Sequence, residues 1–273
     1  MHPELVKKYY ENLSLPGFFP WRLSRKHVRM VLQNRRMLKL NTLRSRIDTF
    51  SSLRKNCVKH APVQVYMSVL NFLFPEEAGL RNTGRRAHPI GGEYVIDVDD
   101  FLFRGVTSHE HPRTWVCDAC LEAARRYAIV LSELVEENYS NVTIVFSGSR
   151  GFHVHVLDFE AGDWVSQGEQ DPFKIQEAAR RRYTLHLSKR LDTCFNGRCF
   201  TFFNDATRVV PVPQTLNAST GLVCRLIGSR RDLEVKSVTR ILDEANPALT
   251  IWPVTILLEH YTGCSNHGIA GGL

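Results

Sequence analysis

Residues 142–159 read VTIVFSGSRGFHVHVLDF and consist of two apolar stretches on either side of a short glycine-containing segment. Side chains alternate in character along both stretches, which is the period of a β-strand. Gly148 and Gly151 favour a tight turn between the stretches, because glycine adopts backbone conformations that other residues avoid. The sequence therefore predicts a β-hairpin with a polar tip, and the fold is built outward from it.

A second strand is predicted upstream, where residues 93–99 read EYVIDVD. Val95 and Ile96 would place apolar groups on both faces, as in a mostly buried strand. Asp97 and Asp99 are two residues apart, so their carboxylates would share one face about 7 Å apart. Such a pair suits Mg²⁺ or Mn²⁺, which prefer oxygen ligands. The alternative is a strand end with two solvated acids.

The hairpin tip carries three side chains that could hold phosphate groups, namely Ser147, Arg150 and His153. Glycines allow the backbone to come close to a bulky anion, and a guanidinium offers a fork of donors to phosphate oxygens. The sequence thus favours a triphosphate-binding turn, although a plain hairpin with a polar tip would look similar.

The other elements follow from hydrophobic periodicity and from turn residues. Helices are predicted over residues 3–13, 24–34, 51–58, 118–138, 173–192 and 236–245, strands over 63–70, 207–213 and 221–228, and a helix or short strand over 253–262. The stretch 75–92 is predicted to be a surface loop, because it contains four glycines and two prolines among charges. Because strands and helices intermix without a regular βαβ order, the expected fold class is mixed α/β (α+β).

A group of four possible zinc ligands lies between the strand at 93–99 and the helix at 118–138. His109, His111, Cys117 and Cys120 have the spacing H-x-H-x5-C-x2-C. Two imidazoles and two thiolates would complete a tetrahedral Zn²⁺ site with no open position, so its role would be structural. The alternative is a loop with two thiols and no metal.

Composition limits the class of protein further. The net charge is +7, which favours polyanionic partners. Basic residues gather at 35–46, 81–86 and 180–182, where each group could also be a solvated face. The apolar runs are too short for a membrane span, and the N-terminus has no apolar signal stretch. The expectation is a soluble cytoplasmic protein that does not bind membranes.

Taken in order, these motifs resemble the small catalytic subunit of archaeo-eukaryotic primases. FSGSRGFHVHVLD is similar to the S-G-x-R-G-x-H signature of that family, and GGEYVIDVD resembles its E-L-V-F-D-I-D strand. PELVKKYYENL, PVQVYMSVLNF and CDACLEAARR look like its opening helix, an early strand and its zinc knuckle. DATRVVPVPQTLNASTGLV resembles the last motif, but Asn217 and Ser219 stand where a histidine and a lysine are usual.

The resemblance implies a primase catalytic core with an RRM-like sheet. It implies a single catalytic domain over residues 1–273, with a zinc-knuckle insertion at about 105–121. By match to the motifs, Asp97, Asp99 and Asp205 would be the catalytic acids and would hold Mg²⁺ or Mn²⁺. The nucleotide would be bound by Ser147, Arg150, His153 and Arg208, and Zn²⁺ would be structural.

The implied function is that of a DNA primase or primase-polymerase, a nucleotidyltransferase making RNA or DNA primers on single-stranded DNA. Implied partners are the template, NTPs or dNTPs, and a primase large subunit or fused accessory domain. A replicative helicase or polymerase is a further possible partner, and the origin would be prokaryotic, plasmid or viral. Two alternatives remain: a polymerase of the same superfamily for end joining or lesion bypass, and a non-catalytic zinc-stabilised nucleic-acid-binding module.

Overall fold

The computed structural model describes residues 1–14, 16, 19–41, 46–78, 84–99, 116–165, 170–195, 201–205 and 207–247. Its helices are α1 (Pro3–Asn12), α2 (Phe50–His60), α3 (Asp118–Glu136), α4 (Pro172–Phe195), α5 (Arg230–Val235) and α6 (Val238–Ala245). Short 3-10 helices are η1 (Leu23–Arg25), η2 (Pro75–Glu77), η3 (Gly84–Ala87) and η5 (Ala161–Trp164). Within these ranges no helix combines the length and the apolar character that crossing a bilayer requires.

The strands are β1 (Val28–Val31), β2 (Met37–Lys39), β3 (Gln64–Ser68), β4 (Leu70–Phe72), β5 (Pro89–Gly92), β6 (Tyr94–Asp99), β7 (Val142–Phe146), β8 (Gly151–Val156), β9 (Thr201–Phe202), β10 (Val209–Pro211) and β11 (Arg225–Gly228). They form one sheet of order β10-β3-β1-β2, a second of order β11-β7-β8-β6-β9, and the pair β4-β5. All the strand pairs of the described residues are antiparallel. The mixed α/β class predicted from the sequence is confirmed.

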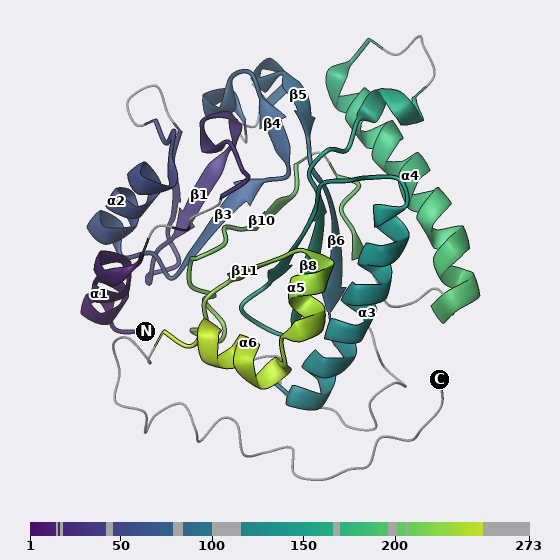
Figure 1. Ribbon diagram of the computed structural model, residues 1–273. Helices are drawn as coiled ribbons and strands as arrows, with labels where there is room; N and C mark the ends of the chain where they lie inside the picture. Colours follow the sequence, from purple (N-terminus) through teal and green to yellow (C-terminus); the bar gives the residue numbers. More distant parts are fainter. Residues whose placement is uncertain are drawn as a thin grey trace.

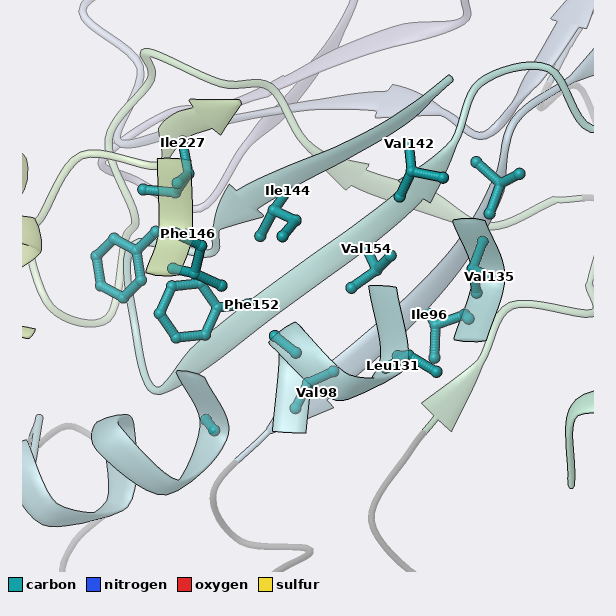
Figure 2. Packing of buried hydrophobic residues seen from close by; sticks show 14 of the residues in the cluster. Ile96, Val98, Leu131, Val135, Val142, Ile144, Phe146, Phe152, Val154 and Ile227 are labelled. Atoms are coloured by element: carbon teal, nitrogen blue, oxygen red, sulfur yellow. The ribbon is translucent and has the colours of Figure 1, made fainter. Parts of the chain in front are cut away.

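Alternation along β6 and β8 divides the second sheet into two faces. One face packs against α3 and its neighbours, and Figure 2 shows Ile96, Val98 and Val154 on that side beside Leu131 and Val135. The opposite face carries Val95, which belongs to a separate apolar cluster with the first sheet, α1 and α2. Figure 1 shows the two sheets side by side, with α1 and α2 next to β1 and β3, and α3 next to β6 and β8. Asp97 and Asp99 share the face of Val95, because they follow it at two-residue intervals.

The hairpin over 142–159 is confirmed as β7 and β8, and the helix over 118–138 is confirmed as α3. The helix predicted over 24–34 is wrong, because the chain there forms η1 and then β1. The side chains of β1 alternate between buried and half-buried, which is the pattern of a strand in a sheet with one face on the core.

Two further expectations need correction. The stretch 75–92 is not only loop, because it contains β5, which pairs with β4. The basic run at 180–182 is not wholly a surface feature, since Arg180 is fully buried on α4. Its guanidinium lies over the rings of Tyr94 and Phe159, at 6.0 and 5.5 Å from their centroids. The element predicted at 253–262, and Arg44 and Arg81 of the basic groups, lie outside the described residues.

Candidate functional site

The two acids of β6 lie partly buried at the face shared with the first sheet. The side chain of Asp97 is 25% exposed and that of Asp99 is 21% exposed. Burial and the nearby charge of Asp99 raise the pKa of Asp97 to about 7, against the opposing effects of Arg150 and Arg208. A buried carboxylate whose pKa is raised by a second carboxylate beside it marks a site that favours a cation.

The strand β8 and the residue just before it, Arg150, place two of the predicted phosphate-binding residues beside these acids. In the antiparallel register His153 stands opposite Asp97, and Gly151 stands opposite Asp99. His153 Nε2 lies 3.5 Å from Asp97 Oδ1, and Arg150 Nη2 donates to Asp99 Oδ2 at 3.3 Å. Burial and the neighbouring His155 lower the pKa of His153 to about 3, so this ring is neutral near pH 7. The strand and the hairpin therefore form one polar site.

The turn between β7 and β8 depends on both of its glycines. Gly148 has a φ of +75°, in the left-handed region that other residues rarely adopt. A Cβ at Gly151 would lie 1.9 Å from the carbonyl oxygen of Val98, so only glycine lets β8 run this close to β6. Across the turn the Ser147 amide donates to the Gly151 carbonyl at 3.0 Å. These contacts hold Ser147 and Arg150 at the end of the sheet.

A second segment supports the turn from the side. Asn217 is buried, and its amide donates to the Ser147 carbonyl at 3.2 Å. Its side-chain oxygen accepts from the Ser219 amide at 2.9 Å, and the Thr220 hydroxyl donates to the Gly148 carbonyl. Asn217, which departs from the family pattern, thus has a supporting contact that the sequence did not reveal, because the residues in contact are 70 positions apart.

Asn217→Ala is expected to weaken nucleotide binding more than turnover. The substitution removes the donor to the Ser147 carbonyl and leaves that part of the turn less ordered. We expect the nucleotide KM to rise about 3- to 10-fold, from a loss of about 1 kcal/mol. Steady-state kinetics with varied nucleotide would measure the KM, with Asn138→Ala, at an exposed residue just after α3, as the control. An unchanged KM would contradict the role given to Asn217.

The third predicted acid follows β9, which pairs with β6 so that Thr201 stands opposite Asp97. Asp205 is exposed, and its Oδ1 accepts from the Thr207 amide at 2.7 Å and the Thr207 hydroxyl at 2.8 Å. Arg208 lies over the Phe203 ring at 5.4 Å and is close enough to Asp97 to lower its pKa. The chain thus brings Arg208 toward the acid pair, and the place of Asp205 as a ligand stays a prediction.

The chemistry of the acid pair fits a divalent cation in part. Among the residues that the structure describes, Asp99 Oδ1 is buried without a hydrogen-bond partner, so one carboxylate oxygen is available for another ligand. Mg²⁺ in phosphate-transfer sites is commonly held by one or two carboxylates together with substrate phosphates and water. Within the described ranges, however, no three or more His, Cys, Asp and Glu side chains are grouped so that they alone could hold a metal ion. The pair fits a metal that a nucleotide helps to hold.

Half of the predicted zinc site can be described. Cys117 precedes α3 and Cys120 lies in its first turn, and each is 4% exposed. Cys117 is the N-cap of α3 and has an extended backbone, so the two cysteines flank the start of the helix. His109 and His111 lie outside the described residues, as does most of the insertion predicted at about 105–121. Zinc binding therefore stays a prediction.

Comparison with known proteins supplies a context for this geometry. Residues 96–211 match the family described as DNA primase small subunit. The DNA primase small subunit of Pyrobaculum calidifontis is 27% identical over 230 residues, which cover 71% of this chain and 68% of that protein. That of Methanocaldococcus jannaschii is 32% identical over 107 residues, covering 36% and 28%.

A solved structure shares the fold. It is the polymerase domain of Mycobacterium tuberculosis Ligase D in complex with DNA, with a TM-score of 0.51 and 13% identity over 91% of each chain. At that identity the likeness concerns the arrangement of helices and strands. The matched family segment begins inside β6 and ends with β10, so it contains both acids, the hairpin, Asp205 and Arg208.

Proposed function

Because the chain belongs to the archaeo-eukaryotic primase superfamily, we propose that it is a template-directed nucleotidyltransferase that makes primers on single-stranded DNA. One observation carries the proposal: the Arg150 guanidinium contacts Asp99 at 3.3 Å, directly beside Asp97. A strong phosphate-binding group and a cation-binding acid pair thus meet at one point, as phosphoryl transfer requires.

The residues divide the work by their chemistry. Arg150 and Arg208 would bind the triphosphate of an incoming nucleotide, and Ser147 and His153 would each add a hydrogen bond. Asp97, Asp99 and Asp205 would hold Mg²⁺ or Mn²⁺, which would neutralise charge on the phosphates. The 3′-hydroxyl would then attack the α-phosphate, and the bond to pyrophosphate, the leaving group, would break. Arg150 has a second task in the unliganded protein, because it offsets the charge of Asp99 until the nucleotide binds.

The domain organisation and partners belong to the same proposal. Residues 1–273 would form a single catalytic domain with an RRM-like sheet built from β6, β7 and β8, and with a zinc knuckle inserted at about 105–121. The partners would be a single-stranded DNA template, NTPs or dNTPs, and a primase large subunit. The relatives' description as small subunits of DNA primase supports the last of these.

The decisive experiment is incubation with unprimed single-stranded DNA, Mg²⁺ or Mn²⁺, and labelled NTPs or dNTPs in parallel. Short labelled products formed without a primer would support primer synthesis. Extension of a primed strand without synthesis on an unprimed one would favour the end-joining or lesion-bypass alternative. DNA binding without any incorporation would favour the non-catalytic module.

The zinc site can be tested without activity. We expect one equivalent of zinc per chain by inductively coupled plasma mass spectrometry, because two thiolates and two imidazoles complete a tetrahedral shell. Cys117→Ser and Cys120→Ser should each lose the metal and lower the melting temperature, since structural zinc contributes to folding. Cys57→Ser, at a buried cysteine of α2, is the control that should keep the zinc. A wild-type protein that melts identically with and without chelator would contradict the assignment.

A further inference from the structure

A group of buried polar side chains lies behind the site and takes no part in the chemistry described above. Glu93 immediately precedes β6 and is 3% exposed. Lys26 Nζ donates to Glu93 Oε1 at 3.1 Å and to the Val69 carbonyl at 2.9 Å. The Trp21 indole donates to Glu93 Oε2, and His155 Nδ1 lies 2.8 Å from the same oxygen. Segments far apart in the chain therefore meet at this one carboxylate.

The charge on Glu93 is maintained despite burial. Burial alone would raise the pKa of Glu93, but Lys26 and His155 outweigh it and lower the pKa to about 2. Arg180 on α4 adds a second buried cation within electrostatic range of Glu93. An ionised carboxylate can only accept hydrogen bonds, so His155 Nδ1 must carry the proton in this contact.

This contact is the one hydrogen bond of the His155 ring within the described part of the chain. His155 is fully buried, and among the described residues its Nε2 has no hydrogen-bond partner. The Trp21 ring packs edge-on against it, with centroids 5.3 Å apart. The tautomer and the orientation of His155 therefore depend on the Glu93 carboxylate.

His155 in turn packs against the histidine of the site. His153 and His155 are two residues apart on β8, so they share a face, and their ring centroids are 5.9 Å apart. His153 has no partner for its Nδ1 among the described residues, so apart from Asp97 it is held by packing. Two rings neighbour that of His153. One is His155, on the same strand, and the other is Phe203, which follows β9 and whose ring centroid lies 6.4 Å from that of His153.

We propose that Glu93 is a positioning residue, which fixes the His155 ring and through it holds His153 beside Asp97. The catalytic consequence rests on the function proposed above, whereas the effect on the His153 ring does not.

The test compares an apolar double variant, Lys26→Met/Glu93→Leu, with the conservative Glu93→Gln. The double variant removes both charges and the acceptor of His155, whereas Glu93→Gln keeps an acceptor oxygen. Arg230→Met/Glu136→Leu is the matched control, because it removes an ion pair of 2.8 Å between α5 and α3. Each protein is labelled with ¹⁵N-histidine and examined by NMR, with the signals of His153 and His155 assigned from His153→Gln and His155→Gln.

We expect the double variant to melt below the wild type, because the buried Trp21 indole and His155 ring lose their acceptor. The ring signals of His155 and His153 should both shift. The kcat of the double variant should fall about 10- to 100-fold, as is typical when a partner that orients a metal-bound histidine is removed. The ring signals and the kcat of Glu93→Gln should lie between those of the double variant and those of the wild type. The surface control, Arg230→Met/Glu136→Leu, should match the wild type in both measurements.

Unchanged His153 signals in the double variant would overturn the proposal, whatever the activity. So would wild-type kcat in a variant whose His153 signals had shifted. If the double variant shows no cooperative melting, the His153 signals and the kcat of Glu93→Gln decide whether the proposal holds. If the wild type incorporates no nucleotide, the proposed function fails, and the His153 signals still decide whether Glu93 positions that ring.

Discussion

Asp97→Asn is expected to reduce nucleotide incorporation about 10³-fold, because it removes a charged ligand from the centre of the site. The amide keeps the shape of the side chain, so the loss would come from the charge. Single-turnover incorporation on a primed template with saturating Mn²⁺ would measure it. Asp163→Asn, at an exposed acid of η5, is the control and should retain full activity. Incorporation above about a tenth of the wild-type rate would contradict the role of Asp97.

The same substitution is expected to stabilise the metal-free protein. The pKa of Asp97 is about 7 in the folded chain, against an ordinary value of 3.8. Between these values the folded state retains a proton that the unfolded chain has released, so stability falls as pH rises from about 4 to 7. Above pH 7 the full cost of the charge remains, and Asp97→Asn removes it. A higher melting temperature than the wild type at pH 8 in EDTA is the expected result, and a lower one would contradict it.

Gly151→Ala is expected to have the largest effect on folding. The added Cβ would lie 1.9 Å from the Val98 carbonyl and 3.0 Å from the Asp99 Cα, and neither backbone atom can turn away as a flexible side chain would. The strands β6 and β8 would have to separate at the acid pair. We expect a loss of about 3 kcal/mol, which corresponds to a fall of about 6 °C or more in melting temperature.

Gly162→Ala is the matched control for this prediction, because a Cβ at Gly162 would meet nothing within 4 Å. Thermal unfolding followed by circular dichroism would compare the two variants with the wild type. Incorporation should be lost in Gly151→Ala even below its melting temperature, since Asp99 and Arg150 would no longer meet at their present distance. Equal melting temperatures for the two variants would contradict the close approach of β6 and β8.

Local patterns predicted the centre of the fold well. The hairpin of β7 and β8, the strand β6 and the helix α3 each have a clear period in the sequence, and each was confirmed. The strand β1 is not predictable from the sequence, because its alternation covers only four residues and is flanked by basic residues that also suit a helix. Short strands of this kind are decided by their partners, and β1 pairs with β2 and β3.

The site was predictable where its residues share one strand or one turn. Asp97 and Asp99 follow the two-residue period of β6, and Arg150 and His153 belong to one hairpin, so proximity in sequence implied proximity in space. Contacts between distant segments were beyond that reasoning. The bond from Asn217 to the turn and that from Lys26 to Glu93 join residues 70 and 67 positions apart, and both depend on strand registers that no local pattern fixes.

The order of strands in the second sheet has a consequence for how the protein folds. The hairpin of β7 and β8 can form by itself, because its strands are neighbours in sequence. The strand β6 pairs with β8 only after a long loop has closed, since Asp99 and Arg150 are 51 positions apart. Closing such a loop costs chain entropy before any pairing compensates, so contacts of this kind form late. During refolding, and during synthesis on the ribosome, helices and the hairpin would precede the assembled acid pair. The nascent chain would thus contain helices and the hairpin before the site of Asp97, Asp99 and Arg150 is complete.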